Sequence, residues 1–322
     1  MKKLKALLSR LKLLLFVYPK LVEAAANVNE TLNRLALVER RLEFIQEALG
    51  RVEGRQLSGA EIRSLSESEY HVFSQWGEDG IIQFLLRHVV VERKVFVEFG
   101  ADQYNVESNT RFLLTNNNWS GLVIDGSPEN IDRLKPTRAY WLYELKAVQS
   151  FITRDNINRL LQENGVSGEI GLLSIDIDGN DYWVWKAVDV ISPVIVTVEY
   201  NYRFGSGPAV TIPYDEGFDR ERAHPSKIYY GASLKALCLL AERKGYAFVG
   251  CNSNGINAFF VRRDRLPGQI RELTAEEGFV AAGVAEVFEL DGEVRKKSPQ
   301  EEILLLRNLN LPLVDVSEDL KG

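Results

Sequence analysis

Residues 172–185 read LLSIDIDGNDYWVW: an apolar run ends in acidic residues and a glycine, and aromatic residues follow. The apolar run is typical of a buried strand, and the residues after Gly179 predict a short helix. Like charges as close in sequence as Asp176, Asp178 and Asp181 repel one another, so the cluster requires a cation, a ligand rich in donors, or open water. We therefore expect a binding site where this strand ends.

Strand and helix patterns alternate on both sides of this stretch. Strands are predicted at residues 94–101, 119–126, 139–148, 170–178 and 194–201. Helices are predicted at residues 78–90, 107–117, 127–135, 155–164, 181–188 and 232–245. Two further strands flank Asn254-Gly255, a dipeptide favoured in tight hairpin turns. This alternation predicts a three-layer α/β sandwich, mostly parallel with an antiparallel last strand, because parallel strands need crossover helices.

A heptad repeat runs through residues 21–53. Its two core positions are Leu21, Val28, Leu35, Leu42 and Leu49, and Ala24, Thr31, Val38, Ile45 and Val52. Only a partner helix covers such a seam, and Arg34 and Glu39 stand where a parallel partner could pair them. We predict a homo-oligomeric coiled coil that ends at Gly50 and Gly54. The alternative is a long helix that packs back on its own globular domain.

The first twenty residues are basic and leucine-rich, with six cations before Glu23, the first acidic residue. Arg10 and Lys12 leave an apolar core shorter than the roughly 7 to 15 residues of a signal peptide or the roughly 20 of a membrane span. A basic amphipathic helix on anionic lipid fits this pattern, and so does a simple extension of the coiled coil. We expect a cytoplasmic protein that contacts the inner membrane face.

The composition places limits on partners and sites. The 322 residues are 45% apolar with a net charge of −6, which argues against nucleic-acid binding. Two cysteines and three histidines are too few for a disulfide framework or a structural zinc site. We expect a linker at residues 54–69, a globular domain at 70–265 and a helical extension at 266–322. In the extension, Thr274 with Glu277 and Ser298 with Glu301 are spaced as capping boxes.

Polar residues follow the predicted strands at their carboxyl ends, where ligands bind in such sheets. In chain order they are Glu98, Asp125, Asp176, Asp178, Glu199 and Asn201, and Gly100 follows Glu98 at the end of the first strand. Because four strands end in acids, we expect one crevice for a ligand rich in hydroxyl and ammonium donors. A dinucleotide is disfavoured, since the turn EFGADQYNVESN has one glycine and acids that would repel a diphosphate.

The chain also resembles a known family in a series of ordered segments. These are SQWGEDGII, VFVEFGA, NTRFLL, WSGLVIDG, LLSIDIDGNDYWVW, VTVEYN, YYGASLKALCLLAERKGY and GINAFFVRRD. Over about residues 70–264 they resemble S-adenosylmethionine-dependent methyltransferases of the FkbM type, which are associated with bacterial polysaccharide clusters. The resemblance implies a Rossmann-like methyltransferase fold and S-adenosylmethionine as the cofactor.

The resemblance also implies which residues bind that cofactor: Gln75, Glu98, Gly100, Asn109, Asp125, Ala147 and Asp176. Glu98 would lie near the amino group of the methionine part, which Gly100 allows the chain to approach. Asp125 would accept both ribose hydroxyls. The backbone around Ala147 would face the adenine, and Asp176 would lie beside the sulfonium.

Methyl transfer to a sugar hydroxyl requires alignment and removal of the hydroxyl proton. Asp176 and Asp178 are candidate bases, as is His224 in a long loop predicted at residues 205–230. Carboxylates at the strand ends could instead hold Mg²⁺. The candidate ligands are Asp176 or Asp178, Glu199 and Asn201. Asp178 has another interpretation, shared with Asp181, as a cap of the following helix.

The expected function is therefore methyl transfer to a hydroxyl of a sugar or surface glycan. Two alternatives stay open. Asp176-Ile177-Asp178 also resembles the metal-binding triplet of nucleotide-sugar glycosyltransferases, although the acidic turn after the first strand would face the donor's diphosphate. A catalytically inactive domain could also serve as a coiled-coil scaffold for glycan enzymes.

Overall fold

The computed structural model describes residues 2–100, 102, 104, 107–282, 286–288 and 294–318. The side chains of residues 2–15, 286–288, 294 and 295 lie outside this description. The chain divides into two compact units, Met1–Arg51 and Val52–Gly322. The first unit is helical, and the second contains the sheet and the cavity described below.

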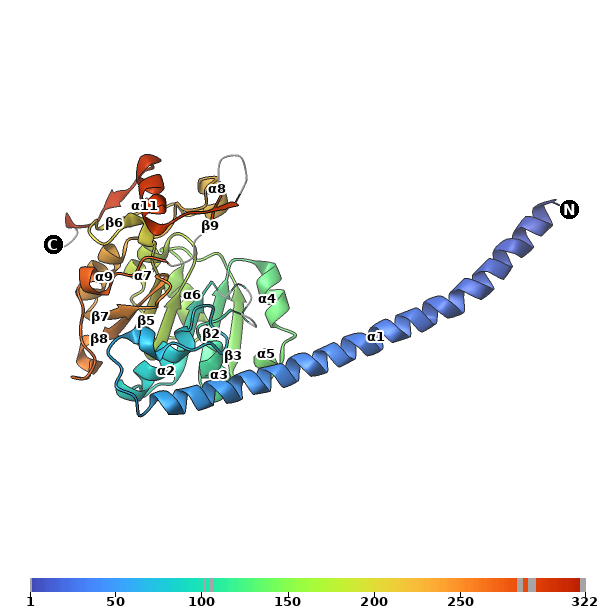
Figure 1. Cartoon of the computed structure of the whole chain (residues 1–322), viewed down its shortest axis with the longest axis horizontal. Coiled ribbons are helices and arrows are strands. Elements are labelled where there is room, and N and C mark those ends of the chain that lie inside the picture. Colours follow the sequence, from blue (N-terminus) through green and yellow to red (C-terminus); the bar gives the residue numbers. More distant parts are fainter. Residues whose placement is uncertain are drawn as a thin grey trace. The chain divides into compact units, whose positions relative to one another are not determined.

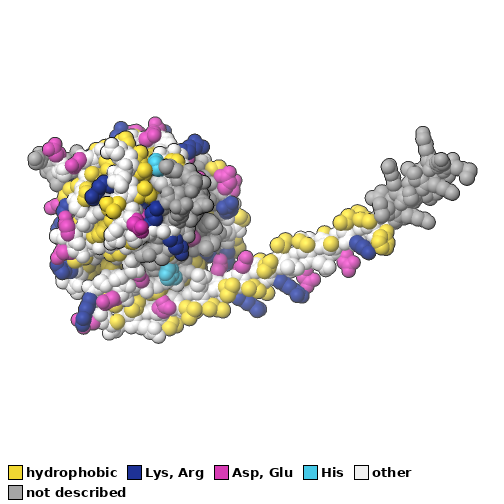
Figure 2. Space-filling model, turned by 45° about the horizontal axis from the view of Figure 1, so that its top comes forward, with side chains coloured by type: hydrophobic (Ala, Val, Ile, Leu, Met, Phe, Trp, Pro, Cys, Tyr) yellow, Lys and Arg dark blue, Asp and Glu magenta, His cyan; other side chains and the backbone are white. Residues whose placement is uncertain are grey.

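Helix α1 (Lys2–Leu57) continues through Pro19, Gly50 and Gly54, so the predicted ends at the two glycines are wrong. The apolar side chains at the heptad positions are 47% to 62% exposed, and Figure 2 shows hydrophobic side chains along this helix. The prediction of a basic amphipathic helix at residues 1–20 depends largely on side chains 1–15, which lie outside the described residues. No described helix combines the length and apolar composition that crossing a bilayer requires.

The second unit is built on a seven-stranded sheet with the order β3-β2-β1-β4-β5-β8-β7. Its strands are β1 (Val95–Phe99), β2 (Ser120–Asp125), β3 (Leu145–Gln149), β4 (Gly168–Ile175), β5 (Ile191–Glu199), β7 (Tyr246–Cys251) and β8 (Asn257–Arg262). Strands β1 to β5 are parallel, and β8 lies antiparallel between β5 and β7. The predicted sandwich, a Rossmann-like methyltransferase fold with an antiparallel last strand, is confirmed (Figure 1).

Two hydrophobic clusters fill the space on either side of the sheet. One contains buried residues of α6 (Ile157–Glu163), α7 (Asp181–Ala187) and α9 (Leu234–Arg243). The other contains buried residues of α2 (Glu78–His88), α3 (Arg111–Asn117), α4 (Pro128–Leu134) and α5 (Arg138–Leu142). Strand residues alternate between the clusters, as period-two side chains require. Because β1 to β5 are parallel, their carboxyl ends lie at one edge of the sheet.

The predicted strand at residues 139–148 is wrong over its first half. Thr137 accepts a hydrogen bond from the Tyr140 amide and caps helix α5, and strand β3 begins only at Leu145. Trp141 is 66% exposed, so this aromatic side chain is not buried against a sheet as the strand prediction requires. The predicted helix at 107–117 likewise begins only at Arg111.

The connections and the chain after the sheet contain short elements. They are η1 (Leu65–Ser68), η2 (Tyr202–Phe204), β6 (Val210–Thr211), α8 (Arg220–Ala223), η3 (Arg263–Arg265), α10 (Ala275–Gly278), β9 (Glu286–Phe288), β10 (Val294–Lys296), α11 (Pro299–Asn308) and β11 (Val314–Asp315). The predicted capping boxes open α10 and α11. The extension therefore contains strands as well as helices, and β11 pairs with β6 of the long loop.

Candidate functional site

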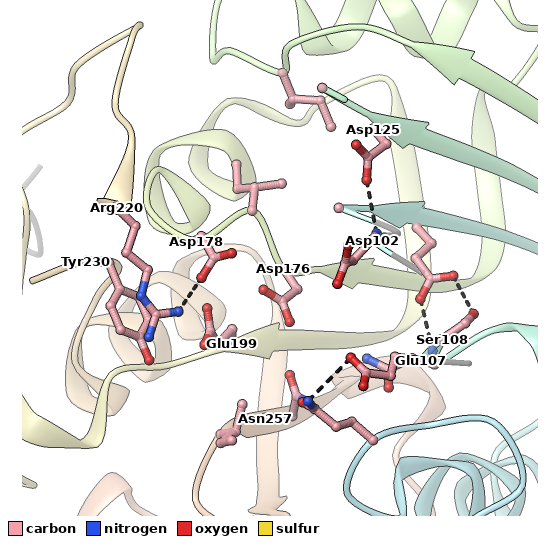
Figure 3. Close-up of a pocket in the computed structure, with 18 of the residues that line it drawn as sticks. Asp102, Glu107, Ser108, Asp125, Asp176, Asp178, Glu199, Arg220, Tyr230 and Asn257 are labelled. Carbon is pink, nitrogen blue, oxygen red and sulfur yellow. Dashed lines mark hydrogen bonds and ion pairs between the residues drawn. The ribbon is translucent and has the colours of Figure 1, made fainter. Parts of the chain in front are cut away.

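A cavity of about 750 Å³ lies at the carboxyl edge of the parallel strands. Of the residues predicted from the sequence, it is lined by Gln75, Glu98, Gly100, Asn109, Asp125, Asp176, Asp178 and Glu199. Figure 3 shows carboxylates from separate strand ends that face this space. The acids at the ends of β1, β2, β4 and β5 therefore share one crevice, as the sequence predicts.

At the end of β1, Glu98 is buried and holds the following loop. Its carboxylate accepts hydrogen bonds from the Ser108 hydroxyl at 2.9 Å, the Asn109 amide at 2.9 Å and the Thr110 hydroxyl at 2.5 Å. Burial raises the pKa of Glu98 to about 7, although these hydrogen bonds favour the charged form. Asn109 in turn donates its side-chain amide to Ser174 of β4 at 3.2 Å. This arrangement fixes one wall of the cavity.

Gly100 is required by a close approach of two strand ends. Its φ is +73°, and a Cβ there would lie 1.6 Å from the carbonyl oxygen of Asp176. Any side chain would therefore push β1 away from β4. Glycine at position 100 therefore allows the strand ends that carry Glu98 and Asp176 to lie close together. Backbone packing is thus a sufficient reason for a glycine at this position.

Asp125 ends β2 with its carboxylate at the cavity. One oxygen accepts from the Ser127 amide at 2.7 Å and the Asn130 side chain at 3.3 Å, and the other accepts from the Asp102 amide at 3.0 Å. The contact with Asp102 is visible in Figure 3. These donors fix the carboxylate at the position where the resemblance implies a ribose.

The most concentrated charge lies at the ends of β4 and β5. Asp176, Asp178 and Glu199 each offer an oxygen within 4.8 Å of the others. Burial, followed by the neighbouring Asp178 charge, raises the pKa of Glu199 to about 8. Burial and the Glu199 charge raise the pKa of Asp176 well above its usual range. The proximity of these two carboxyl groups and their raised pKa values favour the protonated form of at least one of them.

Two further observations define this cluster. Glu199 is 6% exposed, and its Oε2 has no hydrogen-bond partner among the described residues. Arg220 of α8 forms an ion pair with Asp178, and its guanidinium lies 3.8 Å from the ring centroid of Tyr230 (Figure 3). The Arg220 guanidinium therefore lies beside the more exposed carboxylate of the cluster, and the buried Oε2 of Glu199 accepts no hydrogen bond from a described residue.

Asp181 has a structural role in the same turn. It is buried, and it accepts the amides of Ile177 and Gly179 at 2.9 Å each. A Cβ on Gly179 would lie 2.3 Å from the Phe218 ring, so the glycine also allows the long loop to pack here. The helix cap itself is Asn180, which corrects the interpretation of Asp178 and Asp181 as caps.

The structure does not bring Ala147, Asn201 or His224 to the cavity. Strand β3 extends to Gln149, so Phe151 and Ile152 line the cavity after it instead. The Asn201 side chain donates to the carbonyls of Ile228 and Tyr230, and its oxygen accepts from the Arg203 amide. Asn201 is therefore not one of the metal ligands. Its side chain instead joins the end of β5 to the loop through these hydrogen bonds.

His224 contacts Ser226 in its own loop at 2.7 Å and does not line the cavity, so it is not a candidate base in this structure. The segment after β5 and the long loop instead contribute Tyr202, Arg203, Arg220 and Tyr230, of which sequence reasoning missed the two arginines and Tyr230. The available signal was the sequence NYRFG directly after β5, which places polar and aromatic side chains at a strand end.

Both implied groups can be tested against the residues present. For S-adenosylmethionine, the cavity has a volume typical of small-molecule sites, and Asp125 is held at its wall with carboxylate oxygens that can accept hydroxyl donors. For Mg²⁺, the ligands are all oxygens, as that ion prefers, and the buried Oε2 of Glu199 lacks a donor. The residues fit both groups, with Asp178 in place of Asn201 for the metal.

No protein-family model matches the chain, and a search of curated proteins gives no match. Solved structures that the chain matches include the N-terminal domain of EvdMO1 in the presence of S-adenosylhomocysteine (SAH) and D-fucose, at 10% identity, 64% and 84% coverage of the two chains, and a TM-score of 0.38.

Two others are a Bacillus cereus O-methyltransferase in complex with SAH and an S-adenosylmethionine-dependent methyltransferase from Clostridium acetobutylicum. The first has 12% identity, 67% and 88% coverage, and a TM-score of 0.36. The second has 12% identity, 57% and 89% coverage, and a TM-score of 0.35. The strand order of the sheet, rather than these values, identifies the fold as a Rossmann-like methyltransferase sandwich.

Proposed function

We propose that the chain is an S-adenosylmethionine-dependent O-methyltransferase of the FkbM type that modifies a hydroxyl of a sugar or surface glycan. The observation that carries the proposal is the single cavity shared by Glu98, Asp125, Asp176 and Glu199. These carboxylates suit a ligand that combines an ammonium group, a ribose and a positively charged sulfur. They suit a diphosphate poorly, which disfavours the glycosyltransferase alternative.

The proposed cofactor supplies, when bound, a methyl group on a positively charged sulfur. Asp125 would accept the ribose hydroxyls, and the loop fixed by Glu98 would bind the methionine end. The acceptor oxygen must lose its proton as it bonds to the methyl carbon. Asp176 and Glu199 lie at the cavity, and the ionised form of either carboxyl would receive that proton. The pKa of Glu199, raised to about 8, lies near the pH at which a base works best.

We also propose a Mg²⁺ site formed by Asp176, Asp178 and Glu199. It is supported by their proximity and by the unpartnered oxygen of Glu199. The ion would lower the pKa of an acceptor hydroxyl bound to it. In that case the carboxylates would act as ligands, and a chelator would abolish activity.

For the rest of the chain, we propose that the α1 seam pairs with a second copy and that the basic N-terminus contacts anionic lipid at the inner membrane face. The exposed heptad positions support the first proposal. The six cations before Glu23 support the second. Sedimentation with anionic but not neutral vesicles would support the lipid contact.

The function is tested with glycan extracted from cells that lack the gene. The purified chain should transfer labelled methyl from S-adenosylmethionine to this glycan, adding about 14 Da per modified hydroxyl by mass spectrometry, the mass of one CH₂ in the proposed transfer. The chain should also bind SAH in a calorimetric titration. An absence of binding at millimolar SAH would contradict the proposal and favour the scaffold.

A further inference from the structure

The cavity wall that follows β5 rests on the C-terminal extension. Residues of the long loop and of the extension form a separate hydrophobic cluster. Its buried members are Phe204, Ile212, Ile228, Tyr229 and Leu306, with Phe218, Leu305 and Leu309 among those packed against it. Strand β11 pairs with β6, and the Tyr229 hydroxyl donates to the Pro312 carbonyl at 2.5 Å. The extension is thus integral to this wall.

At the centre of this contact, Glu302 of α11 is fully buried. Its Oε2 accepts a hydrogen bond from the Tyr202 hydroxyl and forms an ion pair with Nε of Arg203 at 2.6 Å. Both partners line the cavity. Glu302 therefore contacts two cavity-lining side chains that lie about a hundred residues earlier in the sequence.

Arg203 is only 7% exposed, and yet it lines the cavity. Its pair with Glu302 uses Nε alone, and the two terminal nitrogens make no hydrogen bond to a described residue. These two nitrogens are not among the described buried atoms that lack a partner, so they are open to the cavity and can donate to a ligand bound there. Arg220, the other arginine that lines the cavity, already forms an ion pair with Asp178 and donates a hydrogen bond to the Lys227 carbonyl.

We propose that Glu302 is a positioning residue that holds Arg203 so that its two terminal nitrogens donate hydrogen bonds to oxygen atoms of the sugar acceptor. This inference rests on the proposed function and deepens it. It makes the C-terminal extension part of acceptor recognition. Cofactor binding, which we propose for the β1 and β2 side, would not depend on the pair.

The experiment must separate acceptor binding from simple support of the fold. The double variant Arg203→Met/Glu302→Leu removes both charges and fills their space with apolar side chains, a replacement that usually preserves stability. Arg203→Lys retains the charge opposite Glu302 but loses the forked donors, so it serves if the double variant does not fold. The matched control is Lys235→Met/Glu276→Leu. It removes an ion pair of 2.9 Å between Lys235 Nζ and Glu276 Oε1, and neither residue lines the cavity.

Each protein is assayed for its unfolding midpoint, for SAH binding by calorimetry, and for KM and kcat with glycan extracted from cells that lack the gene. We expect both Arg203 variants to bind SAH as the wild type does. Their KM for glycan should rise about tenfold or more, since the acceptor loses the hydrogen bonds of the forked guanidinium. The control should retain the wild-type KM.

A folded Arg203 variant with the wild-type KM and kcat would overturn this proposal alone, because the pair would then only support the fold. If the wild type bound SAH but methylated no extracted glycan, the proposed acceptor class would fall and this inference with it. Loss of SAH binding in the folded variants would also overturn the inference, since the pair would then serve the cofactor side.

Discussion

At the scale of single residues, Asp125 is the sharpest test of cofactor binding. If its carboxylate accepts both ribose hydroxyls, Asp125→Ala should weaken SAH binding by about 100-fold or more, because hydrogen bonds to a charged group contribute about 1.5 to 3 kcal/mol each. Calorimetry measures the change. Asp132→Ala, on the exposed side of α4, is the control and should bind as the wild type does. Equal affinity of the two variants would contradict the assignment.

Asp181 and Asp178 share one turn but differ in what they support. Asp181→Ala leaves two amides without their acceptor and should lower the free energy of unfolding by about 3 kcal/mol. Asp178 is exposed, so Asp178→Ala should cost less than about 1 kcal/mol. Denaturant titration measures both. The interpretation of the turn would be wrong if Asp178→Ala proved the more destabilising change.

Glu199 predicts a dependence of stability on pH. Its pKa rises from 4.5 in the unfolded chain to about 8 in the fold. Between these values the folded form holds a proton that the unfolded form lacks, so this stabilisation is complete below pH 4.5 and is lost as the pH rises through 8. The slope for one proton is at most about 1.4 kcal/mol per pH unit.

Denaturant titrations from pH 5 to 8 in a chelator should therefore show a steeper decline for the wild type than for Glu199→Gln. Millimolar Mg²⁺ should restore stability more at pH 8 than at pH 6, because the ion competes with the proton. Identical slopes for the two proteins would contradict the raised pKa of Glu199, and an absence of any Mg²⁺ effect would argue against the metal site.

Strand ends were predictable at this scale, and loop contacts were not. Glu98, Asp125 and Glu199 directly end apolar strand patterns, and parallel order places such ends at one edge. The positions of His224 and Arg203 depend instead on the path of a loop without periodicity. Its course is set by Asn201, Phe218 and the distant Glu302, contacts that no local pattern predicts.

At the scale of elements, the heptad of α1 predicts self-association. Leu35 is a core position of the repeat, so Leu35→Lys should place a charge in the seam and convert the oligomer to a monomer. Leu37 is similarly exposed but lies outside both core positions, and Leu37→Lys should leave the oligomer intact. Analytical ultracentrifugation distinguishes them. A monomeric wild type at micromolar concentration would contradict the coiled coil.

Elements with strong local signals were predicted well. The capping boxes of α10 and α11 form because side chain and backbone pair within four residues. The stretch AYWLYELKAV was wrongly predicted to be a strand throughout, because aromatic residues are common in strands. Thr137 instead starts a helix in which Trp141 remains exposed. The pairing of β11 with β6 joins residues about a hundred positions apart, so it lacks a local signal.

At the scale of the whole molecule, the second unit divides its cavity between two supports. The β1 and β2 ends, fixed by Glu98 and Asp125 and their loops, form one side. The segment after β5, tied to α11 through Glu302, forms the other, and the Asp176 and Glu199 pair lies at the strands between them. This division predicts that changes in the extension affect acceptor use and that changes at β2 affect cofactor affinity.

The central claim is that the strand-end carboxylates form a binding site for S-adenosylmethionine, and a crystal structure of the full chain with SAH tests it most directly. We expect the ribose hydroxyls to lie within hydrogen-bond distance of Asp125 and the sulfur to lie beside Asp176. A fully occupied SAH elsewhere on the surface, with no ligand in this cavity, would contradict it.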